Sequence, residues 1–237
     1  RHRHVTLVYS KLLELALKGL GRSVERKVRL VWGDQMTVVY PEIASLGIAR
    51  YGFFGEGLTK MILAHLKPGM TFLDVGAQLG YFTLLAAWLV GDTGQVHSFE
   101  PTPRTFELLR VNAGSKSNVH LNRVAVSSTP GIATMNDYGP RFSAFNSMYG
   151  AKLPKQAGPV TPTSFQAQTI TIDGSISWPV GTQMVFVPSN TSTVTFAESN
   201  STSLDSKDDN KSIDGRYASA ALINYGSNTW FLIGALA

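Results

Sequence analysis

The stretch Thr71-Phe-Leu-Asp-Val-Gly-Ala-Gln-Leu-Gly-Tyr81 decides how the rest of the chain is organised. Residues 72–75 are apolar except for one aspartate, which is typical of a buried parallel strand, and residues 81–90 are apolar enough for a helix packed on a sheet. Gly76 and Gly80 enclose the turn between them, where glycine lets the backbone reverse tightly. The stretch predicts a strand, a tight turn and a helix whose first N–H groups face an anionic ligand.

Position 78 argues against a dinucleotide as that ligand. A dinucleotide-binding loop has a glycine there, because its backbone must approach a pyrophosphate, whereas this chain has Gln78. Twenty residues after Gly80, a second short strand (96–100) ends in Glu100, where a carboxylate can accept hydrogen bonds from both ribose hydroxyls. S-adenosylmethionine fits both observations, with its ribose on Glu100 and its amino-acid end near Asp74 and the glycine turn.

These residues resemble the FkbM-type S-adenosylmethionine-dependent methyltransferases. The resemblance covers about residues 40–173 and runs through Leu66-Lys-Pro-Gly-Met70, Phe72-Leu-Asp-Val-Gly-Ala77, Gly80-Tyr-Phe-Thr-Leu84, Phe99-Glu-Pro101, Phe106-Glu-Leu-Leu109, Asn118-Val-His-Leu-Asn122 with Ala125-Val126, and, in a weaker match, Thr169-Ile-Thr-Ile-Asp173. The family usually has asparagine at position 78, so Gln78 departs mildly from its pattern. The resemblance implies an α/β fold with a Rossmann-like sheet and methyl transfer to an oxygen, such as a hydroxyl of a sugar or another small acceptor.

The candidate cofactor site combines the glycine turn with the end of the following strand. Its members are Asp74, Gly76, Ala77, Gln78, Gly80, Tyr81, Glu100, Pro101 and Glu56. Glu56 stands where the resembled family often has an acidic residue, although a favourable charge at a helix N terminus explains it equally well. We assign no catalytic base, and we interpret His97, on an expected core strand, as structural. We predict no metal site.

The expected elements of residues 1–174 alternate between strands and helices after an opening helix and hairpin. They are a helix at 10–20, hairpin strands at 27–32 and 36–40, a helix at 58–66, a strand at 72–75, a helix at 81–90, a strand at 96–100, a helix at 103–112, a strand at 119–126, extended pieces at 131–135 and 142–148, a loop at 152–164 and a strand at 168–172. This is half of a doubly wound sheet. The resembled family continues with a Lys-Ile-Asp-x-Glu-Gly-type strand and the other half, which we do not find after Asp173, so we predict an incomplete sheet.

From Gly174 onward the composition turns to Ser, Thr and Asn, and no amphipathic helix is evident. We therefore predict that residues 175–237 form a small all-β domain that folds separately. Through Pro179-Val-Gly-Thr182, Gly215-Arg-Tyr-Ala-Ser-Ala220 and Asn228-Thr-Trp-Phe-Leu-Ile-Gly234, this tail resembles β-repeat modules of phage tail and fibre proteins. The aspartates between positions 205 and 214 lack the glycine and the final glutamate of an EF-hand loop, which favours a solvated turn over a calcium site.

The chain has a net charge of +5 and no cysteine, which excludes disulfides and thiolate metal sites. Its basic residues gather near the amino terminus, at Arg1, Arg3, Lys11, Lys18, Arg22, Arg26, Lys27 and Arg29. They could contact nucleic acid or an anionic surface, but no binding motif accompanies them, so we interpret them as a solvated face and expect no nucleic-acid partner. No apolar run reaches about 18 residues, so we expect no membrane span. We expect a cytoplasmic protein, with a virion-associated one as the alternative.

Two functions of different classes remain open. The first is an enzyme that transfers a methyl group from S-adenosylmethionine to a glycan or small-molecule acceptor. The second is a non-catalytic, virion-associated or surface-binding protein with a decayed methyltransferase scaffold, whose β tail mediates attachment or forms a homo-oligomer. Cofactor binding without turnover, or the mass of three chains, would favour the second. A chance join of two unrelated genes is a third interpretation.

Overall fold

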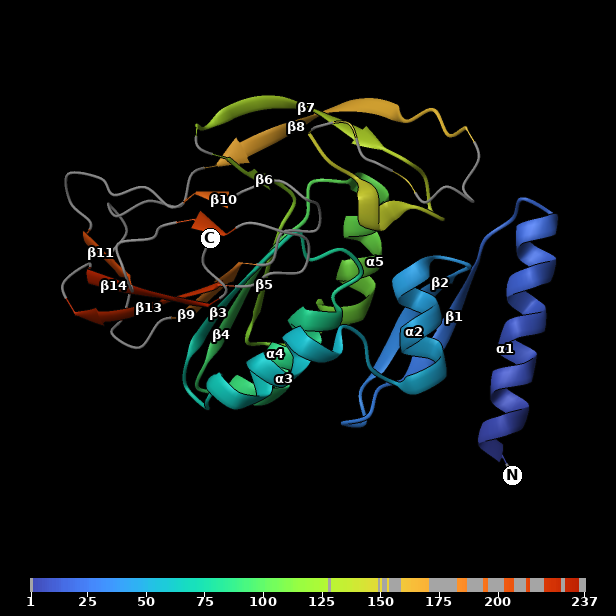
Figure 1. Cartoon of the computed structure of the whole chain (residues 1–237), viewed down its shortest axis with the longest axis horizontal. Coiled ribbons are helices and arrows are strands. Elements are labelled where there is room, and N and C mark those ends of the chain that lie inside the picture. Colours follow the sequence, from blue (N-terminus) through green and yellow to red (C-terminus); the bar gives the residue numbers. More distant parts are fainter. Residues whose placement is uncertain are drawn as a thin grey trace.

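The structure, a computed structural model, describes residues 2–127, 129–148, 150, 153 and 159–170, and beyond these only strand residues (Figure 1). The helices are α1 (His2–Gly19), α2 (Ile43–Tyr51), α3 (Glu56–His65), α4 (Tyr81–Val90), α5 (Pro103–Ala113) and the 3-10 helix η1 (Ser143–Phe145). The strands are β1 (Val24–Arg29), β2 (Gln35–Tyr40), β3 (Thr71–Val75), β4 (Gln95–Phe99), β5 (Val119–Asn122), β6 (Ala125–Val126), β7 (Gly131–Asp137), β8 (Thr163–Ile170), β9 (Gln183–Phe186), β10 (Val194–Thr195), β11 (Ser203–Ser206), β12 (Ser212–Ile213), β13 (Ala220–Gly226) and β14 (Thr229–Gly234).

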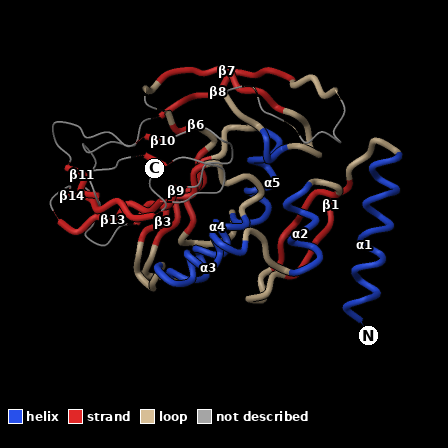
Figure 2. Tube along the Cα trace, viewed as in Figure 1, coloured by secondary structure: helices blue, strands red, loops and turns tan. Residues whose placement is uncertain are grey.

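The largest sheet has seven strands in the order β11-β14-β13-β9-β3-β4-β5. β3, β4 and β5 are parallel neighbours connected through α4 and α5, which confirms the predicted succession of strand, turn, helix and strand. Phe72 of β3 and Val96 of β4 are buried in one apolar cluster with Leu85 and Val90 of α4. α4 therefore covers the face of the sheet toward which these side chains point. Helices α3 and α5 lie beside α4 (Figures 1 and 2).

Strands β9, β11, β13 and β14 of the tail lie in this same sheet, whereas the sequence predicts a β module that folds separately. Whether the tail folds separately stays a prediction. β9 pairs in parallel with β3 through Gln183 opposite Phe72 and Met184 opposite Leu73. β13 then pairs antiparallel with β9, and β14 follows with β11 at the far edge. An unpaired edge of β3 would leave backbone donors and acceptors without partners, and β9 pairs with this edge at Phe72 and Leu73. The predicted division between residues 174 and 175 lies outside the described residues and stays a prediction.

A second, three-stranded sheet with the order β6-β8-β7 lies above the carboxyl ends of β3 and β4 (Figure 1). The strand expected at 119–126 is broken, because the chain leaves the large sheet at Asn122 and joins the small one at Ala125. Residues 168–170 of the strand expected at 168–172 are the end of β8 in the small sheet, and residues 171–172 lie outside the described residues. Within the extended piece expected at 142–148, residues 143–145 instead form η1, whose backbone turns back through a bond from the Phe145 amide to the Phe142 carbonyl. Ser147 is extended and forms an isolated antiparallel bridge with Asn136.

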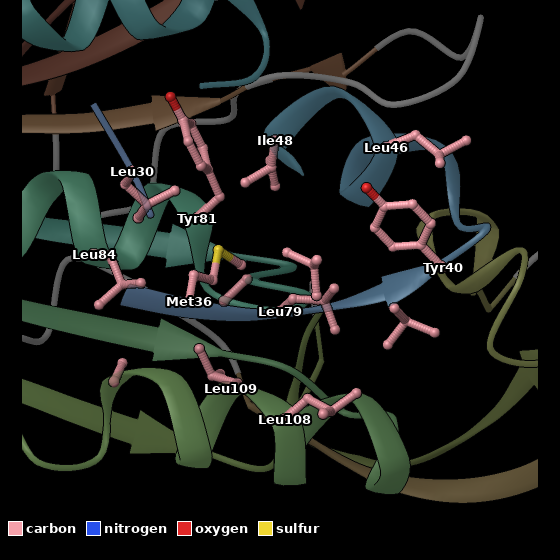
Figure 3. Close-up of a cluster of buried hydrophobic side chains, with 14 of the residues drawn as sticks. Leu30, Met36, Tyr40, Leu46, Ile48, Leu79, Tyr81, Leu84, Leu108 and Leu109 are labelled. Atoms are coloured by element: carbon pink, nitrogen blue, oxygen red, sulfur yellow. The ribbon is translucent and has the colours of Figure 1, made fainter. Parts of the chain in front are cut away.

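The hairpin and α2 build a second core against α4 and α5 (Figure 3). Buried side chains of β2, such as Met36 and Val38, contact Leu79, Leu84 and Leu109 from the glycine turn and the two helices. The amide of Asn112 on α5 donates to the carbonyls of Thr37 and Leu79, and its Oδ1 accepts from the Thr37 N–H. This core holds the glycine turn in place from behind.

Glu14 ties α1 to the body of the molecule. It is buried and accepts hydrogen bonds from Lys18 and Arg50, and from Lys11 at 3.2 Å. Burial alone would raise its pKa, but the hydrogen bonds from Lys18, Arg50 and Lys11 outweigh burial and lower the pKa to about 2. The helix expected at 10–20 is confirmed, and it begins well before residue 10.

We expect Glu14→Gln to lower the unfolding free energy at pH 7 by on the order of 2–3 kcal/mol. The folded pKa lies below the ordinary value of 4.5, so the stabilisation is complete above that pH and is lost as the pH falls toward 2. Urea unfolding between pH 2 and pH 7 measures this difference. The exposed Glu25 on β1 offers a control, since Glu25→Gln should leave the unfolding free energy nearly unchanged. Equal curves for wild type and Glu14→Gln at pH 7 would show that α1 is held by other contacts.

No helix in the described part of the chain is long and apolar enough to cross a membrane.

Candidate functional site

The glycine turn is bound to the end of β4 by backbone hydrogen bonds. The amides of Gly76 and Ala77 both donate to the Phe99 carbonyl, at 2.9 and 3.0 Å. Gly76 has a φ of 76°, and Gln78 has a φ of 50°, which is uncommon for a residue with a side chain. The turn therefore has a defined shape that depends on its neighbour strand, as expected for a backbone that presents its groups to a ligand.

Glu100 follows β4 and is held from both sides by backbone amides. Its Oε2 accepts from the Gln78 N–H at 3.0 Å, and its Oε1 accepts from the Thr102 N–H at 2.9 Å. Burial raises the pKa of Glu100, the bonds from Thr102 and Gln78 oppose this, and the nearby Asp74 carboxylate adds to it. A carboxylate has about four acceptor positions, and the two amides and the Thr102 side chain use three of them, so one is left for a ligand.

Asp74 near the carboxyl end of β3 is the second buried carboxyl of the site. Its Oδ2 accepts from the Thr83 hydroxyl at 2.6 Å, and that hydroxyl also lies 2.8 Å from the Ser98 hydroxyl. Burial raises the pKa of Asp74 to about 6, against the opposing effect of the bonds from Thr83. Two buried carboxyls with raised pKa values at adjacent strand ends are typical of a functional site, because their burial costs stability.

A cavity of about 820 Å³ opens beside these carboxyls. Its floor includes the turn residues and Glu100, and its roof comes from the small sheet and η1, through Ala125, Met135 and Ser143. The side-chain amide of Gln78 donates from Nε2 to the Ser143 hydroxyl at 3.2 Å, so this hydrogen bond joins the floor of the cavity to its roof. The cavity lies where β3 has β4 on one side and β9 on the other, the place at which open α/β sheets bind ligands.

Most of the predicted site residues meet at this cavity. Asp74, Gly76, Ala77, Gln78, Tyr81, Glu100, Pro101 and Glu56 all line it. Gly80 does not, and its place is structural, since a Cβ there would lie 2.6 Å from Leu109 Cδ1. Which of the lining residues bind a cofactor stays a prediction.

Glu56 and Tyr81 have other contacts that limit what they can offer a ligand. Glu56 begins α3, is exposed and pairs with Lys60 at 2.7 Å, and the hydrogen bond from Lys60 lowers its pKa. The Tyr81 hydroxyl lies 3.3 Å from the Thr59 hydroxyl, and its ring packs edge-on against Trp32 and Phe82. Both interpretations of Glu56 therefore stay open, whereas Tyr81 forms an apolar wall.

Sequence reasoning missed the roof of the cavity. Asn146, just after η1, donates to the Thr102 hydroxyl at 3.2 Å and accepts from the Tyr138 N–H at 2.8 Å. These bonds fix the roof above the Glu100 loop. No local pattern around residues 142–148 indicates this position, because it depends on pairing between segments far apart in the chain.

His97 lies away from the cavity, in a stacked pair with His120 on the neighbouring strand. The ring centroids are 4.7 Å apart, and the residues are register partners of β4 and β5. Burial, followed by the neighbouring His120, lowers the pKa of His97. Among the residues that the structure describes, no three His, Cys, Asp or Glu side chains gather as metal ligands.

The raised pKa of Asp74 predicts a pH-dependent stability. The folded chain keeps the carboxyl proton up to about pH 6, whereas the ordinary pKa is 3.8, so the unfolding free energy should fall as the pH rises between these values. An asparagine at position 74 cannot ionise, so we expect the unfolding free energy of Asp74→Asn to lack about 2–3 kcal/mol of this fall with pH. The variant should therefore be more stable than wild type at pH 7 in the absence of ligand. Urea unfolding from pH 4 to pH 7 measures the effect, and the exposed Asp92→Asn is the control. A wild-type curve that rises through this window would contradict the assignment.

No family model matches the chain. The 31-O-demethyl-FK506 methyltransferase FkbM of Streptomyces tacrolimicus is 39% identical to it over 74 residues, which are 31% of this chain and 28% of that protein. The chain thus matches little more than a quarter of that relative's length. Over this part, the match agrees with the resemblance to FkbM-type methyltransferases, while the resemblance of the tail to phage modules stays a prediction.

Among solved structures, matches include three S-adenosylmethionine-dependent methyltransferases. An arsenic(III) methyltransferase of Chlamydomonas reinhardtii is 31% identical and covers 24% of this chain and 22% of its own, with a TM-score of 0.21. A methyltransferase of Aquifex aeolicus is 29% identical, and the match covers 26% of this chain and 35% of that one, with a TM-score of 0.24. An O-methyltransferase of Thermotoga maritima is 20% identical, and the match covers 41% of this chain and 40% of that one, with a TM-score of 0.29. TM-scores this low do not establish a shared fold.

Proposed function

We propose that the chain binds S-adenosylmethionine in the cavity and transfers its methyl group to an oxygen of a sugar or another small hydroxyl-bearing acceptor. The observation that carries the proposal is the Glu100 carboxylate, which is buried, fixed by two backbone amides and at the wall of the cavity. The match to the Streptomyces methyltransferase supports the choice of cofactor.

The residues fit the two polar ends of this cofactor. A ribose offers two neighbouring hydroxyl donors, and Glu100 has an acceptor position left after its bonds to the Gln78 and Thr102 amides and to the Thr102 side chain. The ammonium group of the amino-acid end and the sulfonium carry positive charge, which would offset the cost of the buried Asp74 carboxylate. The absence of a glycine at position 78 suits a ligand without a pyrophosphate.

The cavity is large enough for the chemistry that we propose. Its volume of about 820 Å³ lies in the upper part of the usual range for small-molecule sites, about 300–1,000 Å³. The bound cofactor supplies an activated methyl group, and the chain positions it by holding both of its ends. Methyl transfer is an in-line displacement, for which positioning provides much of the rate. The roof residues Met135 and Ala144 line the part of the cavity above the turn, where an acceptor would enter.

We expect Glu100→Ala to weaken S-adenosylmethionine binding by about 1.5–3 kcal/mol, the usual range for hydrogen bonds to a charged group. Isothermal titration calorimetry at pH 7.5 measures this change. Glu107→Ala is the matched control, because Glu107 is an exposed glutamate that pairs with Arg110 on α5. Equal affinities for wild type and Glu100→Ala would remove Glu100 from the site.

Turnover distinguishes the enzyme from the non-catalytic alternative. Incubation with S-adenosylmethionine labelled in its methyl group, together with a panel of glycosides and small alcohols, should yield labelled product and S-adenosylhomocysteine. Binding that is sensitive to Glu100→Ala, without label transfer to any acceptor, would instead favour a binding protein with a decayed methyltransferase scaffold. Failure of wild type to bind the cofactor would contradict the proposed enzyme, whereas a decayed scaffold does not require cofactor binding.

A further inference from the structure

α1 carries apolar side chains on the face that points away from the molecule. Its inward face buries Ser10, Glu14 and Leu17. On the other side Leu12 is 61% exposed and Leu15 is 55% exposed, and Leu20, just after the helix, is 69% exposed. In Figure 1, α1 forms one edge of the molecule beside β1, and within the described part of the chain no element lies against its outer side.

The surroundings of these leucines are strongly basic. Residues 9–29, whose side chains the structure describes, contain six Lys and Arg and two Glu, a net charge of +4, whereas the whole chain carries +5. One of the two glutamates is Glu14, which is buried and surrounded by three cationic side chains. The guanidinium of Arg26 lies over the ring of the exposed Tyr9, 5.5 Å from its centroid. Exposed leucines therefore stand beside a surface that is mostly basic, with Glu25 of β1 as an exposed acidic residue on it.

We propose that α1 and β1 form a docking surface for an anionic membrane. An amphipathic helix with leucines on one face and basic residues beside them lies in the plane of the interface, with its apolar side chains below the headgroups. Basic residues near such a surface are attracted to anionic headgroups, and the aromatic ring of Tyr9 suits the boundary between headgroup and hydrocarbon.

A second copy of the chain fits this face less well than a membrane. Three partly exposed leucines offer apolar area on the order of a few hundred Å², below the roughly 800 Å² per partner of a stable interface. Two copies meeting at this face would also bring like charges together, because the basic residues surround it in each copy. An anionic bilayer satisfies the leucines and the charges at the same time.

The bonds of Glu14 explain how the face can be exposed in a stable protein. Arg50 of α2 pairs with Glu14 and donates to the Ser10 hydroxyl at 3.2 Å, which holds α1 to α2 from the inward side. The Ser10 hydroxyl also lies 3.1 Å from the Tyr40 hydroxyl of β2. The leucines are therefore presented outward by a fixed helix. No residue of α1 lines the cavity described above, so this proposal does not rest on the proposed function.

Vesicle sedimentation of the full chain tests the proposal. We expect binding to vesicles of phosphatidylcholine mixed with phosphatidylserine at low salt, weaker binding at high salt, and little binding to phosphatidylcholine alone. The affinity of the double variant Leu12→Ser with Leu15→Ser for the anionic vesicles should be lower than that of wild type by about tenfold or more. Arg22→Ser with Lys27→Ser should lose about fivefold for each charge removed. Leu63→Ser is the control, because Leu63 is an exposed leucine on α3, away from this face.

Three results would overturn the proposal. The first is the absence of binding to anionic vesicles at low salt. The second is an equal loss of binding in Leu63→Ser and in the α1 variant. The third is a wild-type dimer in light scattering that the leucine substitutions dissociate, which would make this face an interface between copies. All variants change exposed side chains, so each should fold. The charge variant keeps the leucines and the leucine variant keeps the charges, so each contribution to vesicle binding is measured separately.

Discussion

Met184→Pro should lower the unfolding free energy by about 3 kcal/mol or more and expose the chain to aggregation. Met184 lies in β9, between Leu73 of β3 and Leu222 of β13, in the middle of the seven-stranded sheet. Proline has no N–H to donate and is not tolerated in a central strand, so the sheet would divide between its two halves. Urea unfolding and light scattering of wild type and variant measure the two effects.

Thr195→Pro separates this effect from a general effect of proline in the tail. Thr195 lies in β10, which pairs only with β12 among the described strands, outside the large sheet. We expect this variant to lose much less stability than Met184→Pro. If instead the two variants behave alike and the amino-terminal part unfolds in an unchanged transition, the tail is a separate module, as its composition suggests.

The half of the fold that contains the candidate site could be predicted from local pattern. The strand at 72–75, the helix at 81–90 and the strand ending before Glu100 each depend on apolar periodicity and glycine placement within a few residues. Parallel strands end at the same edge of a sheet, so the sequence alone places Asp74 and Glu100 close together. Their burial and raised pKa values agree with this placement.

The pairing of β9 with β3 could not be predicted, because more than a hundred residues separate the partners and only two residue pairs join them. The sequence around β9 is rich in Ser and Thr, and this composition gives no sign that the backbone of β9 joins a buried sheet. The helix α2 was missed for a local reason. Its N-cap is Glu42, whose carboxylate accepts from the Ala44 and Ser45 amides, whereas the usual N-cap residues are Ser, Thr, Asp and Asn.

Gly80→Ala should destabilise the protein by about 2–5 kcal/mol, because two separate costs add. The φ of Gly80 is 92°, in a region that side chains rarely adopt. A Cβ would also lie 2.6 Å from Cδ1 of Leu109, which is completely buried and has little room to move. Chemical denaturation of the ligand-free chain measures the total.

Gly76→Ala separates the two costs, since Gly76 has a φ of 76° but open space where its Cβ would be. We expect Gly76→Ala to lose only the backbone part, about 1–2 kcal/mol. Shortening the neighbour with Leu109→Val should recover part of the loss in Gly80→Ala, so that the double variant is less destabilised than the sum of the single variants by about 1–3 kcal/mol. If the losses of the two single variants simply add in the double variant, glycine is required at position 80 for its backbone conformation alone, and the space beside Leu109 of α5 does not matter.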